Sequence, residues 1–529
     1  MPQIHVDGVQ YEVEEGRTLL QALDDLGLLM NGVDIPHYCW HPKLSIDGSC
    51  RLCQVEVEGL PKLQIACNTK VQDGMVVHTQ TEKVKIAREA VMELLLVNHP
   101  LDCPICDQAG ECKLQDYAFR YGRGHARTRE PRRPGRKRVA LGPEVVFDEE
   151  RCILCRRCVR FCREVPGSGE LAVEGRGDRS VIATFPGESL DNPYSMNVAD
   201  ICPVGALTTR DFRFKMRVWF LKDVPGICTG CAKGCNVDLG TADGAVQRMV
   251  PRRNDAVNDT WICDAGRLSY HEITSPSRLV HPAVREAGGR LVAASLEEAL
   301  AEAAARVRRA VAAKGPGVVG ALASPHASNE DLYQLRCFLE GLGSEVSGMV
   351  VPTGPADDLL VQPEKAANAT GGRALGFGSP RGILDRASGG GLDVLILLGH
   401  DLLSAGLQDD PQALAALESV ILLDTHRSKL EGVAHVVLPT RHATEKLGTF
   451  TNHAGRVQRM LPAAEPPFPA WSEGELLLRL GRALELPACE GPWSPEAVSL
   501  RMSETVPAFS GVHLGTVGAL GRPLAETSA

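Results

Sequence analysis

The chain has 529 residues, of which 44% are hydrophobic, and it carries a formal net charge of −9 with a pI near 6.0. This length predicts three to five domains, and the acidic balance argues against general nucleic-acid binding. Apolar runs are shorter than a membrane span, and the opening MPQIHVDGVQ lacks the apolar core of a secretory signal. The 18 cysteines therefore indicate metal or redox chemistry in a reducing compartment rather than a disulfide framework.

The opening residues are predicted to form a compact α+β unit. Apolar and polar residues alternate on both sides of Asp7-Gly8, a hairpin turn signal. Thr18 and Gln21 form a capping box for a helix that Gly27 ends. A lone cysteine, a C-x2-C pair and a distant fourth thiol resemble the [2Fe–2S] ligands of plant-type ferredoxins, whose first gap is shorter. These four predicted ligands are Cys39, Cys50, Cys53 and Cys67.

A helix predicted from Glu82 to about Asn98 places His99 at its C-terminal end. Its apolar face is expected to comprise Val84, Ala87, Val91, Leu94 and Leu95. His99 could simply cap the helix, where the helix dipole favours it. Ligation is favoured because the three cysteines that follow leave a [4Fe–4S] cluster one ligand short. The second predicted set, within HPLDCPICDQAGEC, is His99, Cys103, Cys106 and Cys112.

A basic segment, residues 123–138, holds eight Lys or Arg against one Glu. Charge runs usually stay hydrated, so a solvated linker is one interpretation. The alternatives are contact with an acidic partner or with anionic clusters, and nucleic acid comes last.

The third set begins with CILCRRC, whose C-x2-C-x2-C spacing lets one loop hold three irons of a [4Fe–4S] cluster. Cys162 extends this run to the bacterial ferredoxin spacing, but Arg163 stands where that motif has proline. A remote Cys-Pro pair at Cys202 is therefore the preferred fourth ligand. The predicted set is Cys152, Cys155, Cys158 and Cys202.

The fourth set has three near ligands and one far ligand, which again suits a [4Fe–4S] cluster. Structural zinc is the main rival, but it is normally held by two separated close pairs. The predicted ligands are Cys228, Cys231, Cys235 and Cys263. Cys337 and Cys489 are expected to be ordinary thiols.

Beyond Ser277 the pattern changes to alternating helices and short buried strands, which predicts an α/β domain with a largely parallel sheet. Capping signals at Ser295 with Glu298, and at Ser328, begin two of the helices. A further helix is expected at PQALAALE, between the strands DVLILLG and VILLD. Glycine-rich stretches such as 388–391 are loops, and none forms a dinucleotide fingerprint.

The run HPLDCPICDQAGEC, followed by CILCRRC and CPVGAL, resembles the large iron–sulfur subunit of proton-pumping NADH:quinone oxidoreductase, respiratory complex I. The resemblance implies a multidomain α+β and α/β fold. It implies an N-terminal β-grasp [2Fe–2S] ferredoxin-like domain, [4Fe–4S] modules and a C-terminal molybdopterin-oxidoreductase-like domain. The expected divisions are 1–82 for the [2Fe–2S] domain, 83–122 for the His-containing module, 123–145 for the basic linker, 146–220 for the ferredoxin-like [4Fe–4S] module, 221–277 for the molybdopterin-oxidoreductase-type [4Fe–4S] domain, and 278–529 for the degenerate α/β domain.

The C-terminal half is similar to formate dehydrogenases and other bis-pterin enzymes, but it departs from them at the metal. GLGSEVSGMVVPTG lacks the Cys or selenocysteine expected there, and the terminal pterin-binding domain is not expected. Ala265 replaces a basic residue, and Ala454 replaces an acidic one. No molybdenum is therefore expected, and this half is interpreted as a retained scaffold.

The resemblance implies one [2Fe–2S] and three [4Fe–4S] clusters that relay electrons, without a catalytic acid, base or nucleophile in this chain. The implied partners are the flavin and NADH-binding subunit and the quinone-side iron–sulfur subunits, without nucleic acid. Membrane contact is expected only through the assembled complex, on the cytoplasmic side of a bacterial cell membrane. The alternatives are the large subunit of an NAD-linked formate dehydrogenase and the relay subunit of a soluble hydrogenase.

Overall fold

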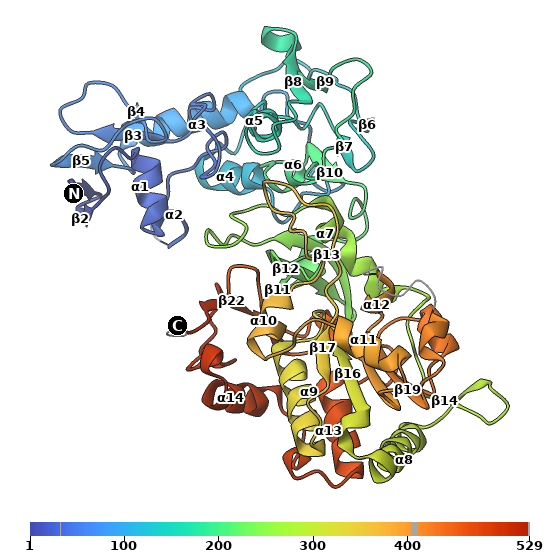
Figure 1. The fold of residues 1–529 in the computed structure, drawn as a ribbon. Helices are drawn as coiled ribbons and strands as arrows, with labels where there is room; N and C mark the ends of the chain where they lie inside the picture. Colours follow the sequence, from blue (N-terminus) through green and yellow to red (C-terminus); the bar gives the residue numbers. More distant parts are fainter. Residues whose placement is uncertain (32, 405–410, 527–529) are drawn as a thin grey trace. The chain divides into compact units, whose positions relative to one another are not determined.

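The computed structural model describes residues 1–31, 33–404 and 411–526, which divide into two units, Met1–Leu221 and Lys222–Ala529. Mixed sheets and helices make up both units, as expected for a multidomain α+β and α/β protein (Figure 1). Within these described ranges, no helix is long and apolar enough to cross a bilayer.

The first unit opens with a five-stranded sheet of order β2-β1-β5-β3-β4. Its strands and first helices are β1 (Gln3–Val6), β2 (Val9–Glu12), α1 (Leu19–Asp25), α2 (Leu28–Asn31), β3 (Gln54–Val57), β4 (Gln64–Ile65) and β5 (Met75–His78). Asp7 and Gly8 both have positive φ, 48° and 83°, which confirms the predicted hairpin turn. The predicted capping box of Thr18 and Gln21 is also present.

The predicted helix is α3 (Glu82–Leu96), and α4 (Lys113–Tyr121) packs against it. The predicted apolar face was wrong at Leu94, which is 74% exposed. The buried face instead consists of Val84, Arg88 and Met92. Arg88 Nη2 donates a hydrogen bond to the Gln54 carbonyl at 3.0 Å. This hydrogen bond therefore sets which face of α3 packs against β3. The spacing of apolar residues does not reveal such a contact.

A second α+β module completes the first unit, with a three-stranded sheet of order β10-β7-β6 and a separate β8–β9 hairpin. Its elements are β6 (Val139–Ala140), β7 (Val145–Phe147), α5 (Arg157–Glu164), β8 (Leu171–Glu174), η1 (Gly177–Arg179), β9 (Val181–Thr184), α6 (Asn197–Asp200), β10 (Leu207–Thr209) and η2 (Val218–Phe220). The strands of this module are short, so most of its cysteines lie in or beside loops. Several loops can bring their cysteines to one site.

The second unit begins with an antiparallel sheet of order β11-β12-β13. Its elements are β11 (Lys222–Ile227), β12 (Asn236–Ala242), β13 (Ala245–Pro251), α7 (Asp264–Leu268) and η3 (Ser269–Thr274). The connection between β11 and β12 contains three cysteines, and the fourth directly precedes α7.

A seven-stranded sheet, of order β15-β14-β20-β19-β18-β16-β17, forms the centre of the second unit. Strands β16 to β20 pair in parallel, as predicted, while β14 and β15 are antiparallel. The elements here are β14 (Ala283–Arg285), β15 (Leu291–Ala293), α8 (Leu296–Lys314), η4 (Pro316–Val318), β16 (Val319–Ala323), α9 (Asn329–Leu342), β17 (Ser347–Met349), α10 (Ala369–Ala374), α11 (Arg381–Ser388), β18 (Val394–Leu398), α12 (Asp401–Ser404), η5 (Pro411–Leu414), β19 (Ser419–Asp424), η6 (Lys429–Gly432) and β20 (Val436–Pro439).

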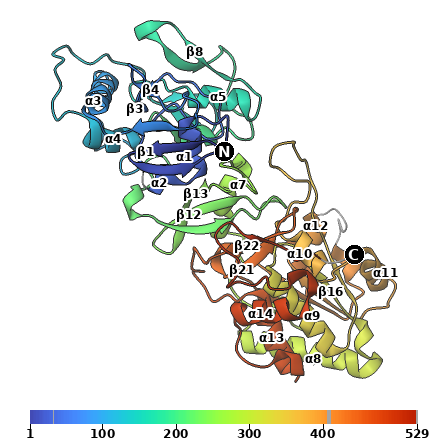
Figure 2. The same ribbon diagram turned by 90° about the vertical axis from the view of Figure 1, so that its left-hand side faces the viewer.

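Alternate residues of these strands enter two separate hydrophobic clusters, one on each face of the sheet. Ile396 and Leu398 pack with α8, α9 and the later helices α13 (Glu473–Ala483) and α14 (Pro495–Thr505). Leu395 and Leu397 pack with α11 and η6 on the opposite face. The helices α8, α9, α13 and α14 lie together in both ribbon views (Figures 1 and 2).

The prediction of a helix at PQALAALE was wrong. The structure shows only the short 3-10 turn η5 in this segment. The structure adds α14, which the sequence analysis did not anticipate. The remaining elements are η7 (Ala443–Glu445), β21 (Gly448–Thr451), β22 (Arg456–Met460), η8 (Pro487–Cys489), η9 (Pro507–Phe509) and β23 (Arg522–Pro523), and the three strands form a small antiparallel sheet.

A buried lysine joins α9 and α13. Lys446 Nζ lies 2.7 Å from Asp331 Oδ2 and also contacts Glu473, and its side chain is 4% exposed. Lys446→Met would leave two buried carboxylates without their cation. We expect the opening free energy of the α9 backbone amides, measured by hydrogen exchange, to fall by about 3–5 kcal/mol. Exposed Lys429→Met is the control, and equal protection in both variants would contradict this role for Lys446.

Candidate metal centres

The four thiols of the first predicted set meet beside the β1–β5 sheet. Cys39 Sγ and Cys50 Sγ are 3.4 Å apart, and Cys67 contacts both Cys39 and Cys53. Hydrogen bonds among these thiols lower the pKa values of Cys39 and Cys53 and raise those of Cys50 and Cys67. All 18 cysteines of the chain are free. Four sulfurs that lie in contact and form no disulfide are a donor set that suits an iron–sulfur cluster, because these clusters are held by thiolates.

Three members of the second predicted set, His99, Cys103 and Cys112, line a cavity of 580 Å³. Burial, aided by the positive charge of Arg151, lowers the pKa of His99 to about 4. The imidazole is therefore neutral near pH 7, as a metal ligand must be. His99 Nδ1 is buried and has no hydrogen-bond partner in the described structure. A buried nitrogen without a hydrogen-bond partner favours a role for His99 as a metal ligand over a role as a helix cap.

Cys106 lies close to the same group, since the thiolate charges of Cys103 and Cys106 contribute to the raised pKa of Cys112, behind burial. Burial is the largest cause, and the Cys112 pKa is about 11. A Cβ atom on Gly205 would lie 2.4 Å from Cys106 Sγ. A glycine at this position therefore leaves room for the sulfur.

The third predicted set lines one small cavity with all four of its thiols, Cys152, Cys155, Cys158 and Cys202. Burial and the charge of Cys155 raise the pKa of Cys202 to about 12. Cys162 is fully buried but does not line this cavity. Its pKa is raised to about 12 by burial and by the charge of Glu170. The structure therefore places Cys202, and not Cys162, with the CILCRRC thiols.

The fourth predicted set forms where the β11–β12 connection approaches α7. The backbone N–H of Cys228 donates to the Cys235 carbonyl at 2.8 Å, which closes the loop. The Gly266 N–H donates to Cys263 Sγ at 3.3 Å. A Cβ atom on Gly266 would lie 3.0 Å from Cys228 Sγ and 3.1 Å from Cys263 Sγ. Burial and the charges of Cys228, Cys231 and Cys263 raise the pKa of Cys235, so these three thiols lie near Cys235.

Two buried arginines between the first and third sets were missed by the sequence analysis. Arg157 and Arg160 are 5% and 4% exposed, and both donate hydrogen bonds to carbonyls of the cysteine loops. Their only sequence signal is their place beside Cys158. Arginine is usually exposed, so this signal does not distinguish them from surface residues.

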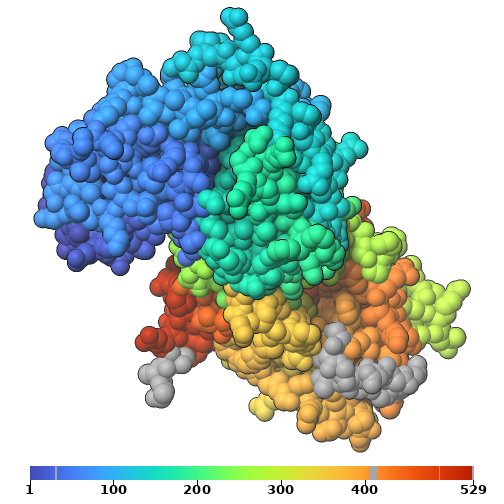
Figure 3. All heavy atoms as spheres, turned by 90° about the horizontal axis from the view of Figure 1, so that it is seen from above, coloured from blue at the N-terminus to red at the C-terminus, as the bar shows by residue number. Residues whose placement is uncertain are grey.

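The basic segment contacts acidic residues of its own unit. Its arginines and lysine form ion pairs with α3 and with the β7–α5 region: Arg123 with Glu89, Arg127 with Glu93, Arg136 with Glu149, and Lys137 with Asp102 and Glu150. Most of its residues are exposed, and Figure 3 shows this part of the chain, in cyan, on the surface of the first unit. Part of the basic segment is therefore paired with acidic residues of this chain.

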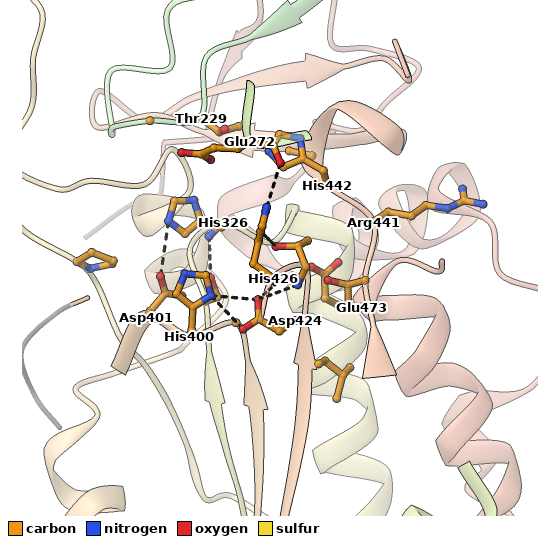
Figure 4. Close-up of a pocket in the computed structure, with 18 of the residues that line it drawn as sticks. Thr229, Glu272, His326, His400, Asp401, Asp424, His426, Arg441, His442 and Glu473 are labelled. Carbon is orange, nitrogen blue, oxygen red and sulfur yellow. Dashed lines mark hydrogen bonds and ion pairs between the residues drawn. The ribbon is translucent and has the colours of Figure 1, made fainter. Parts of the chain in front are cut away.

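A polar cavity of 340 Å³ lies at the carboxyl ends of the parallel strands in the second unit (Figure 4). His400 Nδ1 lies 3.0 Å from Asp424 Oδ2, and His326 Nε2 lies 3.6 Å from Asp401 Oδ1. The hydrogen bond to Asp424 raises the pKa of His400 to about 9. No cysteine is among the described residues that line the cavity. This cluster is not evident from the sequence, because its residues follow separate strands that only the sheet brings together.

Five family models match successive parts of the chain. They are a 2Fe-2S iron-sulfur cluster binding domain at 2–82, the NADH-ubiquinone oxidoreductase-G iron-sulfur binding region at 88–127, and the ferredoxin-like domain of NADH-quinone oxidoreductase subunit 3 at 142–208. The molybdopterin oxidoreductase Fe4S4 domain matches 221–275, and the molybdopterin oxidoreductase model matches 278–359 and 358–481. Each of the four cysteine-containing regions thus falls within an iron–sulfur model.

Similar proteins include the G subunit of the NADH-quinone oxidoreductase of Rickettsia conorii, 41% identical over 344 residues, which are 65% of this chain and 50% of that protein. The mitochondrial NADH-ubiquinone oxidoreductase 78 kDa subunit of Candida albicans is 41% identical over 346 residues, 65% of this chain and 46% of that protein. The chain therefore spans about half the length of the curated relatives it matches.

Among solved structures, an NAD+-reducing [NiFe]-hydrogenase in the H2-reduced state is 30% identical, with a TM-score of 0.36, and the match covers 41% of this chain and 91% of that one. That likeness is too weak in structure to carry an argument. The sequence relatives and the family models agree with one another along the chain. The chain is a homologue of the G subunit of NADH-quinone oxidoreductase, with 2Fe-2S and 4Fe-4S binding domains followed by a molybdopterin oxidoreductase domain.

Proposed function

We propose that this chain is the electron-relay iron–sulfur subunit of the peripheral arm of NADH:quinone oxidoreductase. The observation that carries the proposal is the second ligand set. Its His99 imidazole is neutral and has an orphaned nitrogen, and the segment matches an iron-sulfur binding region of that oxidoreductase. A general acid, base or nucleophile is not needed for this function, because the chain only has to hold, insulate and tune its clusters.

The proposed cofactors are one [2Fe–2S] cluster and three [4Fe–4S] clusters, which would accept and release single electrons when bound. The first set, Cys39, Cys50, Cys53 and Cys67, would hold the binuclear cluster. His99 with Cys103, Cys106 and Cys112 would hold the second, and the third and fourth sets would hold the remaining two. Eight of the fifteen proposed ligand cysteines are buried and Cys103 is exposed, and this exposure is one of the factors that set reduction potentials.

The proposed partners follow from the relay. A flavin-bearing, NADH-oxidising subunit would deliver electrons, and quinone-side iron–sulfur subunits would receive them. Peripheral attachment on the cytoplasmic side of a bacterial membrane, through the assembled complex, is part of the same proposal. The molybdopterin-oxidoreductase region would act as a scaffold without molybdenum, since the cavity of the second unit is lined by His, Asp and Thr and not by a thiol.

The cluster content tests this function directly. With one binuclear and three cubane clusters, anaerobically purified full-length protein is expected to contain about 14 iron atoms per chain, with matching sulfide. Metal analysis combined with low-temperature electron paramagnetic resonance measures both. Stoichiometric zinc, or iron for only two clusters, would overturn the assignment. Stoichiometric molybdenum would favour a formate dehydrogenase instead.

A further inference from the structure

Arg157 and Arg160 lie on one side of α5, three residues apart, and are buried together. In the part of the chain that the structure describes, neither guanidinium forms an ion pair within 4.0 Å. The Nε atom of each is also buried without a hydrogen-bond partner there. Glu164, which senses the charge of Arg160, hydrogen-bonds to Ser45 and Arg163 instead. Two buried cations without a carboxylate are unfavourable unless another negative group compensates them.

The hydrogen bonds of these arginines connect two ligand sets. Arg157 donates to the carbonyl of Trp40, next to Cys39, and to the carbonyl of Ile201, next to Cys202, the latter at 3.2 Å. Each end of this guanidinium thus touches a different cysteine loop.

Arg160 connects the same two ligand sets through a different loop of the third set. It donates to the carbonyls of Cys39 and of Ser45 in the first-set loop, and to the Cys155 carbonyl of the third set at 3.5 Å. The arginines therefore contact the loops of the first and third sets, and the clusters bound there would supply the compensating negative charge.

Resting on the proposed function, we propose that Arg157 and Arg160 are positioning residues that raise the reduction potentials of the clusters held by the first and third ligand sets. Each added electron increases the negative charge of a thiolate-bound cluster, and a nearby buried cation stabilises that charge. Because these two side chains contact the loops of both sets, we expect their effect to be largest on these two clusters.

The test is a redox titration of the full chain followed by electron paramagnetic resonance. Arg157→Met and Arg160→Met remove the charge and retain much of the side-chain length. We expect the midpoint potentials of the first and third clusters to shift downward in both variants, and by more than those of the second and fourth clusters. Arg163→Met is the matched control, because Arg163 is on the same helix but its side chain is 67% exposed.

Arg160→Lys keeps the positive charge and distinguishes charge from shape. If Arg160→Met loses the first and third clusters, their retention in Arg160→Lys at near-normal potentials would support the inference. Unchanged potentials in Arg→Met variants that keep all clusters would overturn it. Loss of one cluster alone, with the other unshifted, would also overturn it. Absence of both signals from the unaltered chain would instead refute the proposed function.

Discussion

Cys202→Ala is expected to abolish the cluster of the third ligand set. The four thiols Cys152, Cys155, Cys158 and Cys202 line one cavity, so the variant leaves three ligands for a cluster that takes four. Iron content should fall by about 4 atoms per chain, with loss of one cubane resonance signal. On the proposed function, NADH-to-quinone electron transfer in the assembled complex should be lost as well.

Cys162→Ala is the matched comparison, because this thiol is also buried and is only four residues from Cys158. Unlike the four thiols of the set, it does not line their common cavity. Iron content and electron transfer should stay close to those of the unaltered chain. If Cys162→Ala removed the cluster and Cys202→Ala did not, the ligand assignment of the third set would be reversed.

Local patterns predicted much of the fold because their interactions lie within a few residues. The Asp7-Gly8 turn needs two residues with positive φ, and the Ser295 and Glu298 side chains cap a helix through bonds to nearby backbone. The parallel sheet was predictable for a similar reason. Its strands are continuous apolar runs such as VLILL, which suit burial on both faces.

Features that depend on tertiary contacts could not be read in the same way. Leu94 has the right spacing for a buried position, but the face of α3 is decided by the Arg88 bond to Gln54 on another element. The His400–Asp424 pair joins the ends of two strands that are distant in sequence. Burial of Arg157 was equally hidden, because its partners are carbonyl groups that any residue could supply.

The ligand sets fall between these cases. Spacing identified most thiols of each set, since C-x2-C runs place neighbouring sulfurs around one site. The distant members required more than spacing. Cys202 was chosen over Cys162 from its proline, and Cys263 from the need for a fourth ligand. Their positions beside the other thiols come from the approach of α6 and α7, which sequence patterns do not specify.

His99→Ala is expected to weaken or remove the second cluster alone. The other three sets share no ligand with it, so their resonance signals should remain, and iron should fall by at most about 4 atoms per chain. His125 also lines the 580 Å³ cavity, which makes His125→Ala a control that should retain every signal.

His99→Cys tests ligation from the opposite direction. A thiolate in place of a neutral imidazole makes the bound cluster more negative, so the cubane should be retained with a lower reduction potential. A capping histidine would behave differently, because its interaction is with the helix end and not with iron. Cluster spectra and potentials that stay the same in both His99 variants would show that the histidine is structural. A downward shift of one cubane in His99→Cys, together with its loss in His99→Ala, is explained only by direct ligation.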